Sequence, residues 1–583
     1  MSTRKPFSGS QRGLVVAFDL GTTFSGISFS VLDPGVVPRI QSVTRFPDQT
    51  PGGSSKIPSV LYYDDKGVAR AIGAETQSPV KIEEAEDKGW IKVERFKMHL
   101  RPKSPASLLD SKHVPLFPPS LSLSAVLADY LRYLLKCVKS FIEETVLPDG
   151  AKLWVSVENR IIFVLSHPNG WEGSLHSSMR QAAVEAGLVT NADDQDRIHF
   201  VTEGKASLHF CVNNGLEIGE NEGIIILDAG RGTIDLSAYS SSGSGETITF
   251  HEISRSECCF AGSVFVTQAA RRYLEDKLKG TQFERDVDTM VEYFDRTTKL
   301  LFKDSNDPSF IKFGGRNDND PTLNIRAGQV KIPGSDVARF FERSVKAALE
   351  AITRQCSNAP NITSVFLVGG FAASEWLWSQ LKEELQLLGL IQFFYCFITP
   401  SSNKAVSDGA VSFHLDCLVD TRVSRSTYGL GTYAVYEANN PEHQIRGYVT
   451  NVLTGELQVL NQYSVILQKD VQILKAQEFR ASFYQESATR LNNISVNILK
   501  YEGIIEYPAW TDEDAEMYST ACTVAADVSR ISHKTLRRKP WNDLIYYKTE
   551  FDVILLFGLT ELKAQIAWKE GNVGLSRSLE NFR

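Results

Sequence analysis

Two short acidic turns carry the residues best suited to chemistry. The first, Asp19-Leu20-Gly21-Thr22-Thr23, follows an apolar run over 14–18. Gly21 lets the backbone approach a ligand closely, so the N–H groups and threonine hydroxyls of the turn could hold phosphate oxygens. Asp19 stands at the strand end, where its carboxylate could bind a hydrated Mg²⁺. The alternative for this stretch taken alone is an ordinary hairpin turn.

The second turn repeats the layout of the first. An apolar run over 224–227 precedes Asp228-Ala229-Gly230-Arg231-Gly232-Thr233, so that Asp19 aligns with Asp228 and Gly21 with Gly230. Polar and apolar residues alternate after both turns, which is typical of a half-buried strand. The repeat predicts two hairpins in two related half-domains that face each other across a cleft, with the phosphates and metal of a nucleotide between the two carboxylates.

A third segment, 365–374, has an apolar strand that runs into Gly369, Gly370 and Phe371 and then into a predicted helix. A helix N-terminus favours an anion, and glycines permit close approach by a ligand. The alternative is that these glycines only allow the strand and the helix to pack together.

The elements around these motifs follow from hydrophobic periodicity and turn residues. We expect helices over 121–146, 173–187, 264–278, much of 283–302, and 337–351, and strands over 61–63, 154–157 and 161–165. The segment 80–100 is charged and predicted to be helical in part. Loops are expected over 47–59, 101–120 and 304–320, with a turn over 240–245.

In this order the three motifs resemble those of the actin-like ATPase superfamily, and most of all the seventy-kilodalton heat-shock chaperones. The 369–371 segment together with Ser407-Asp408-Gly409-Ala410 is similar to their adenosine motif and the helix after it. The resemblance covers 14–414. It implies an α/β fold with a two-lobed, actin-like (duplicated ribonuclease H-like) ATPase domain over 14–415: lobe I about 14–205, lobe II about 206–400 and a return helix over 401–415. Residues 1–13 are expected to be disordered.

The resemblance also implies roles for individual residues. Lys97 would reach the γ-phosphate, and Glu203 would orient the attacking water; the alternatives are a solvated helix lysine and a helix N-terminal carboxylate favoured by the dipole. Asp19 and Asp228 would hold Mg²⁺, largely through its waters. The phosphates would be cradled by Thr22, Thr23, Gly230, Gly232 and Thr233, and the adenosine would be backed by Gly369, Gly370 and Phe371.

The chain departs from the family at several positions. Arg231 replaces a glycine, and it could aid the phosphates, block the site or, as we expect, turn out to solvent. Gly204 stands where the family has a proline after the glutamate. The segment 259–263 has one glycine where the family has a glycine-rich turn. Asp295, Arg296 and Lys299 fall in the adenine-binding region, although a plain charged helix face is the interpretation we favour.

The segment 420–583 has a different sequence pattern, in which short runs of alternating apolar and polar residues are separated by turn residues. Strands are predicted over 427–436, 464–467, 481–484, 494–500, 551–557 and 563–568, and a β-rich domain without a strong helix is therefore expected. The segments 424–429 and 555–561 resemble the truncated β substrate domain of the atypical twelve-A/twelve-B branch of these chaperones. The acidic, leucine-rich linker has only a faint counterpart at 415–420, and no long helical lid follows.

Composition narrows the class of protein. The chain has 583 residues, a formal net charge of -8 and a pI near 5.8, and no long basic run, which argues against nucleic acid as a partner. Residues 1–13 have no apolar centre of a signal peptide, and no apolar run approaches the ~20 residues of a membrane span. The eight scattered cysteines suggest a reducing compartment. A cytoplasmic or nuclear location is expected.

The function that the sequence predicts is an ATP-binding, slowly ATP-hydrolysing, chaperone-like switch. Its cofactors would be ATP or ADP and Mg²⁺, and its partners would be protein or peptide clients of the β-rich domain and co-chaperones. One alternative is a nucleotide-binding or nucleotide-free scaffold without turnover. A second is a small-molecule kinase of the same fold, for which we find no catalytic carboxylate, and a third is a filament-forming actin relative.

Overall fold

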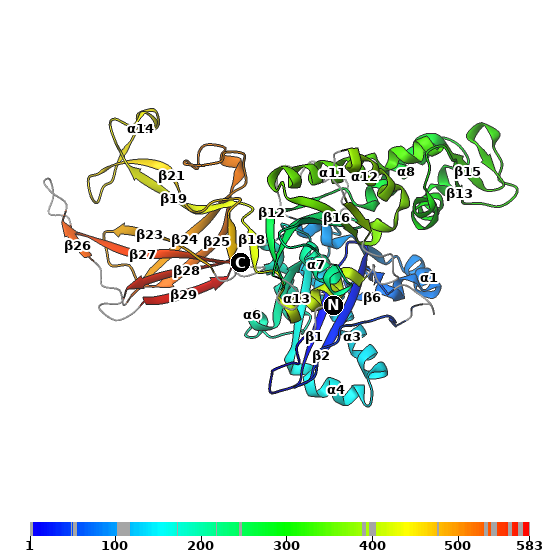
Figure 1. The fold of residues 1–583 in the computed structure, drawn as a ribbon, viewed down its shortest axis with the longest axis horizontal. Coiled ribbons are helices and arrows are strands. Elements are labelled where there is room, and N and C mark those ends of the chain that lie inside the picture. Colours follow the sequence, from blue (N-terminus) through cyan, green and yellow to red (C-terminus); the bar gives the residue numbers. More distant parts are fainter. Residues whose placement is uncertain are drawn as a thin grey trace. The chain divides into compact units, whose positions relative to one another are not determined.

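The structure is a computed structural model of the chain, which combines helices and strands in a mixed α/β fold (Figure 1). It describes residues 4–47, 49, 55–101, 117–171, 173–216, 218–243, 248–387, 392–395, 404–474, 477–529, 534–537, 545–557, 562–569 and 575–581. The chain forms two compact units, of which the first comprises 1–171 and 178–419 and the second comprises 172–177 and 420–583.

A first mixed sheet carries the first acidic turn. Its strand order is β3-β2-β1-β8-β9, and β4 pairs with β2. The strands are β1 (Gly13–Asp19), β2 (Phe24–Leu32), β3 (Gln41–Ser42), β4 (Ile57–Pro58), β8 (Ile161–His167) and β9 (Ile198–Thr202). β1 runs antiparallel to β2 and parallel to β8. Because β1 lies in the middle of the sheet, its residues 14–19 are all buried, which explains the continuous apolar run.

A second mixed sheet repeats this topology and carries the second acidic turn. Its strand order is β12-β11-β10-β16-β17, again with one antiparallel hairpin beside parallel strands. The strands are β10 (Gly223–Ala229), β11 (Ile234–Ser242), β12 (Thr249–Cys259), β16 (Ile362–Val368) and β17 (Gln392–Tyr395). In both sheets, therefore, the third, second, first, fourth and fifth strands along the chain follow one another in space.

Two helices, α7 (Glu203–Asn213) and α13 (Ala405–Asp416), lie side by side (Figure 1). The helix α13 contacts β1, β2 and β8 of the first sheet, whereas α7 directly follows β9 and packs mainly against β10 and β11 of the second sheet. Their backbones are close, because a Cβ atom at Gly409 would lie 1.8 Å from the Ala206 carbonyl oxygen. Asp408 fixes α13 to the sheet by accepting hydrogen bonds from Ser28 and Ser42.

The remaining elements lie between the strands of the two sheets along the chain. Between β4 and β10 the chain forms β5 (Val60–Tyr63), β6 (Ala69–Ile72), α1 (Pro79–Asp87), β7 (Ile91–Glu94), the 3₁₀ turn η2 (Phe96–Leu100), α3 (Leu123–Thr145), α4 (Gly150–Val157), α5 (Ser174–Glu185), whose residues 174–177 are grouped with the second unit, and α6 (Asp194–Arg197). The part of the chain between β12 and α13 adds α8 (Ser263–Leu278), α9 (Val287–Tyr293), the π-helical turn η7 (Phe294–Thr298), α10 (Lys299–Leu301), β13 (Ser309–Lys312), β14 (Ile325–Arg326), β15 (Gln329–Ile332), α11 (Gly334–Asn358), the 3₁₀ turn η9 (Gly370–Ala373) and α12 (Glu375–Leu387). Apolar residues of α8, α11 and α12 share one core with β10, β11 and β16.

The second unit is built mainly from strands. One sheet has the order β20-β21-β19-β24-β25, another has β23-β27-β28-β29 with β26 beside β27, and β18 pairs with β22. The bounds are β18 (Thr421–Val423), β19 (Thr427–Val435), β20 (Val449–Thr450), β21 (Leu457–Leu467), β22 (Gln472–Leu474), β23 (Glu478–Ser487), β24 (Asn493–Tyr501), β25 (Tyr518–Asp527), β26 (Lys534–Arg537), β27 (Ile545–Phe557), β28 (Leu562–Lys569), β29 (Leu575–Asn581) and the short helix α14 (Pro441–Arg446). Both sheets contribute to one apolar core, which includes Ile498, Val524, Val553 and Ile566.

Several predicted elements are confirmed. Both acidic turns join antiparallel strands, and the aligned residues Ile27 and Leu236 occupy equivalent positions, opposite Phe18 and Leu227. The helix expected over 121–146 is α3, in which the Ser122 side chain caps the first turn. The strand expected over 161–165 lies in β8, and the helices over 264–278 and 337–351 lie in α8 and α11. No helix among the described residues is both long and apolar enough to cross a bilayer.

Other predictions are wrong. The strand expected over 154–157 belongs to α4, where the Asp149 side chain accepts a hydrogen bond from the Lys152 N–H and caps the helix. Short apolar runs do not distinguish a helix from a strand. The loop expected over 304–320 contains β13. In the loop expected over 47–59, residues 57 and 58 form β4, whereas 48 and 50–54 lie outside the described residues, as do 102–116 of the loop expected over 101–120. Of the turn expected over 240–245, residues 240–242 belong to β11, and 244 and 245 lie outside the described residues.

The N-terminal residues, expected to be disordered, make specific contacts within the first unit. Arg4 forms a two-pronged ion pair with Asp416 at the end of α13, with both N–O distances at 2.7 Å. The Phe7 backbone exchanges hydrogen bonds with Gly35 and Val36. The polarity of the sequence suggested disorder, but the Arg4–Asp416 ion pair and the backbone hydrogen bonds of Phe7 attach this segment to the first unit.

Candidate functional site

The two acidic turns lie next to each other. A Cβ atom at Gly232, in the second turn, would lie only 2.7 Å from the Thr22 Oγ1 atom in the first. A side chain at residue 232 would therefore displace Thr22, so the glycine is needed for the two turns to come this close. This contact brings the threonines and backbone amides of both sheets together, as the repeated motif predicted.

The first turn is held in shape by two serines. The Ser59 hydroxyl donates to the Gly21 carbonyl oxygen at 2.8 Å, and its backbone N–H donates to the Thr23 carbonyl at 2.8 Å. Ser25 lies 2.9 Å from the Ser59 hydroxyl and accepts from the Gly21 N–H at 3.3 Å. The turn is also tight, because a Cβ atom at Gly21 would lie 1.9 Å from the Phe24 carbonyl oxygen. These bonds pre-organise its shape without using the threonine hydroxyls.

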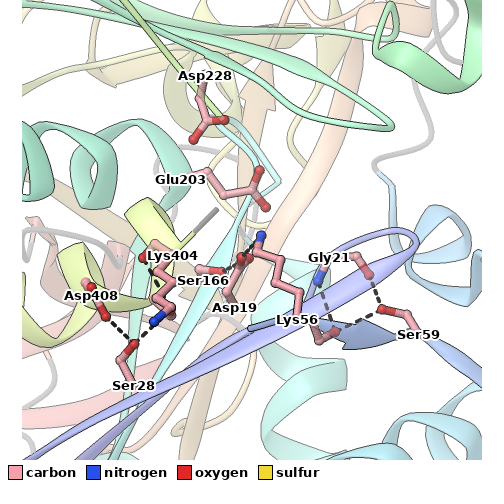
Figure 2. A network of polar contacts seen from close by, with 12 residues as sticks. Asp19, Gly21, Ser28, Lys56, Ser59, Ser166, Glu203, Asp228, Lys404 and Asp408 are labelled. Carbon is pink, nitrogen blue, oxygen red and sulfur yellow. Dashed lines mark hydrogen bonds and ion pairs between the residues drawn. The ribbon is translucent and has the colours of Figure 1, made fainter. Parts of the chain in front are cut away.

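Charged side chains gather where β1, β9 and β10 end, and we call them the charged cluster: Asp19, Lys56, Lys97, Glu203 and Asp228. Figure 2 labels Asp19, Lys56, Glu203 and Asp228. The Lys56 ammonium donates to Asp19 Oδ2 at 2.7 Å. Ser166, on β8, donates to Asp19 Oδ1 at 3.2 Å. Asp228 Oδ2 accepts from the Ser207 hydroxyl of α7 at 2.6 Å.

The carboxylates of the charged cluster affect one another. Burial and the neighbouring Glu203 raise the pKa of Asp228 to about 7, with a further contribution from Asp19. Burial lowers the pKa of Lys56, but Asp19, with Asp228 and Glu203, outweighs it and holds that pKa above its usual value. Asp19 and Asp228 are 3% and 4% exposed. The two acids thus share one electrostatic environment, which the sequence analysis required of them.

Lys97 and Glu203 form a buried ion pair. Lys97 lies in η2 and Glu203 is the first residue of α7, and their N–O distance is 2.6 Å. The Lys97 side chain is 3% exposed and that of Glu203 is 13% exposed. The alternative of a solvated lysine is therefore wrong. Glu203 does stand at a helix N-terminus, as its alternative proposed, but there it also meets a lysine that is 106 residues earlier in the chain.

Close packing explains why residue 204 is a glycine. A Cβ atom at this position would lie 2.2 Å from the Ser237 hydroxyl and 3.2 Å from the Asn169 amide group. The Asn169 side chain donates to the Leu236 carbonyl at 3.0 Å, so α7, β11 and the segment after β8 meet here. A side chain at 204 would separate these elements.

Arg231 is not turned out to solvent. Its guanidinium forms an ion pair with Asp295 and lies 5.5 Å from the centre of the Phe24 ring. One third of the side chain is exposed, at 33%. The arginine thus connects the second turn with η7 and with β2, and our expectation for it is wrong because the sequence could not show that Asp295 lies opposite.

Asp295 and Lys299 form a buried pair rather than a plain charged helix face. Lys299 is 3% exposed and donates to Asp295 and to the Thr267 hydroxyl. Burial would raise the pKa of Asp295, but Lys299 and Arg231 lower it to about 2. Burial lowers the pKa of Lys299 to about 8. Arg296 alone behaves as expected of a charged face, since its side chain is 68% exposed and pairs with Glu292.

The segment 259–263 supports the second turn. The backbone N–H groups of Ser263 and Val264 donate to the carbonyls of Gly230 and Arg231 at 3.2 and 2.9 Å. A Cβ atom at Gly262 would lie 2.4 Å from the Arg231 carbonyl oxygen. The single glycine that the sequence retains is the one that the close contact with the turn requires, and these amides already have partners in the protein.

The third motif lies against the second turn. Gly369 has a φ of +90°, and a Cβ atom there would lie 2.3 Å from Asp228 Oδ1. Gly370 begins η9. The Phe371 ring stacks with Phe341 in the core and is 3% exposed. Gly370 and Ala373, in contrast, are exposed, and the role of the segment toward an adenosine stays a prediction.

The charged cluster offers few open ligand positions to a directly coordinated Mg²⁺. Carboxylate oxygens suit this ion, but the two Asp19 oxygens already accept from Lys56 and Ser166, and one Asp228 oxygen accepts from Ser207. Among the residues that the structure describes, no group of three or more histidine, cysteine or carboxylate side chains could hold a metal ion. As arranged, the residues do not fit a directly bound Mg²⁺.

Two members of this site were missed in the sequence. Lys56 stood in a segment interpreted as a surface loop, and nothing in its neighbours marks it. Asp235 follows the second turn in the sequence and was given no role there. In the hairpin register it lies opposite Asp228, and its Oδ1 accepts from the Asn169 N–H at 2.6 Å. Burial and Glu203 raise the pKa of Asp235 well above its usual value. Register counting from Asp228 would have found it.

Comparison of the chain with protein-family models finds no match, and neither does comparison with curated proteins.

Proposed function

We propose that the first unit binds ATP and ADP between its two acidic turns and hydrolyses ATP slowly. The observation that carries the proposal is the contact of the two turns, one from each of two sheets with the same strand order, around the buried Lys97–Glu203 pair. A repeated sheet with strand order 3-2-1-4-5 supports a duplicated ribonuclease H-like, actin-like architecture over 14–415, with α13 as the return helix.

In this proposal the roles follow from charge and position. Phosphoryl transfer to water depends on charge neutralisation and positioning more than on covalent chemistry. The amides and hydroxyls of Thr22, Thr23 and Thr233 hold phosphate oxygens. Lys97 moves from Glu203 to the terminal phosphate, and the released Glu203 carboxylate orients a water molecule. The Arg231–Asp295 pair closes the site beside the nucleotide.

The second unit would bind clients. Its described residues contain two five-stranded sheets around one core, a two-stranded sheet of β18 and β22 and, among the described residues between 420 and 583, one α-helix of six residues, α14. We propose that it is a β-rich binding domain over 420–583 without a helical lid, and that its partners are proteins or peptides. Coupling to nucleotide requires that this domain favours one arrangement of the first unit over another.

The test is calorimetric titration of the purified chain with ATP in the presence of Mg²⁺, followed by a phosphate-release assay. We expect saturable binding and slow turnover, and Glu203→Gln, which removes the carboxylate that orients the water molecule, should abolish turnover. The absence of any ATP affinity would refute the proposal, and unchanged hydrolysis in Glu203→Gln would show that the site is misassigned.

A second candidate is a nucleotide-binding scaffold without turnover. The observation in its favour is that the guanidinium of Arg231, the residue that departs most from the family, is fixed by Asp295 and Phe24. Tight nucleotide binding without phosphate release would decide for this candidate.

A further inference from the structure

The ammonium group of Lys56 contacts Asp19, the carboxylate that the sequence analysis assigned to a hydrated magnesium ion. We propose that Lys56 is a built-in cation of the nucleotide site, so that this chain binds a nucleoside diphosphate or triphosphate without a divalent cation. The inference rests on the proposed nucleotide site and adds the charge that completes it.

Both oxygens of the Asp19 carboxylate already accept a hydrogen bond from the protein. Lys56 Nζ lies 2.7 Å from Asp19 Oδ2, and the Ser166 hydroxyl donates to the other oxygen at 3.2 Å. The Asp19 side chain is 4% exposed, whereas that of Lys56 is 22% exposed. Figure 2 shows the lysine chain reaching along the first turn to Asp19, with Glu203 and Asp228 beyond it.

The backbone holds Lys56 in this place. The next two residues form β4, in which Ile57 pairs with Ser25 and Pro58 with Phe24. The Tyr130 hydroxyl donates to the Pro58 carbonyl at 3.0 Å, and Ser59 is bonded to the first turn at both Gly21 and Thr23. Lys56 therefore belongs to the same rigid segment as the turn that would hold the phosphates.

The charge balance favours the same conclusion. Two lysines, Lys56 and Lys97, pair with the carboxylates of Asp19 and Glu203 and offset their charge. A nucleotide anion therefore meets less net negative charge in the cluster than it would without Lys56. Without Lys56 the Asp19 carboxylate would be uncompensated, and phosphates would need another cation to approach it.

The experiment measures ADP affinity of the full chain by calorimetry, with EDTA and with excess Mg²⁺. The variants are Lys56→Gln, Lys56→Arg and, as a matched control, Lys66→Gln, which changes an exposed lysine in the turn after β5. The wild type should lose less than about tenfold in affinity on removal of Mg²⁺, Lys56→Gln should lose at least about a hundredfold, and both Lys56→Arg and Lys66→Gln should behave like wild type.

A second measurement does not depend on nucleotide. Titration with Mn²⁺, followed by electron paramagnetic resonance, should detect no site in the wild-type cluster and a gained site in Lys56→Gln, because removal of the ammonium frees Asp19. This measurement also shows that the variant is folded.

The outcomes separate the two proposals. Wild-type binding of ADP only in the presence of Mg²⁺ would overturn the role of Lys56 while leaving the nucleotide site intact, and so would equal binding by wild type and Lys56→Gln in EDTA. No binding of ADP or ATP under either condition would overturn the proposed function, and the built-in cation with it.

Discussion

Replacement of Lys97 by methionine tests the buried ion pair on which the site depends. The Lys97 side chain is 3% exposed, and its ammonium lies 2.6 Å from the Glu203 carboxylate. Lys97→Met therefore removes the buried charge that pairs with Glu203 and nearly preserves the volume of the side chain. It leaves the Glu203 carboxylate near Asp228 and Asp235, whose pKa values it already raises.

The expected loss of unfolding free energy depends on how the unpaired Glu203 carboxylate responds. Removal of one partner from a buried pair costs about 3–5 kcal/mol. The carboxylate can instead bind a proton, which costs about 1.4 kcal/mol per pH unit above the usual titration point of glutamate, so the loss is limited to about 4 kcal/mol at pH 7 and about 1 kcal/mol at pH 5. The double variant Lys97→Met, Glu203→Gln should recover about 2 kcal/mol or more of that loss.

The assay is urea unfolding of the full chain at both pH values. The matched control is Lys92→Met, since Lys92 pairs with Glu94 at 2.8 Å but the two side chains are 51% and 35% exposed, and such a pair is worth about 0–1 kcal/mol. The reasoning is refuted if Lys97→Met costs no more than Lys92→Met, if its cost does not depend on pH, or if the double variant is as unstable as the single one.

Two further predictions concern stability. Burial, which outweighs the attraction of Asp416, lowers the pKa of His209 to about 4. Between pH 6.5 and 4 the unfolded chain therefore binds a proton at His209 while the native state does not, so the free energy of unfolding of the wild type should fall by about 3 kcal/mol over this range. A series of thermal-unfolding experiments should show a weaker pH dependence of stability for His209→Met. Parallel pH dependences of the two proteins would exclude His209 as the cause. Gly369→Ala should lower the free energy of unfolding by more than about 2 kcal/mol, because the φ of +90° and the contact with Asp228 Oδ1 both oppose a side chain. The control is Gly35→Ala, which has a φ of +75° and nothing within 4 Å and should cost only about 1 kcal/mol in chemical denaturation. Equal costs would show that the close contact at Gly369 is unimportant.

The hairpins could be predicted from the sequence because local signals and the fold agree there. An apolar run followed by a glycine turn and an alternating strand determines both the hairpin and its register, and that register places Asp19 and Asp228 at the ends of equivalent strands. The same is true of α3, where helical periodicity and the Ser122 cap point to one answer.

The polar partners could not be predicted because tertiary packing determines them. Lys56 reaches Asp19 through β4, a two-residue strand with no periodicity to detect. Arg231 and Asp295 are 64 residues apart, and their pairing depends on which way η7 turns its charged side. For α4, the apolar residues alone allowed a strand, and the Asp149 cap, which determines the helix, lies outside the apolar run.

The most direct test of the central claim is a crystal structure of the chain with bound ADP. The account predicts the phosphates between the two acidic turns, within hydrogen-bond distance of Thr22 or Thr23 on one side and Thr233 on the other, with Lys56 still next to Asp19. A nucleotide bound elsewhere, or two turns that do not share a ligand, would contradict it.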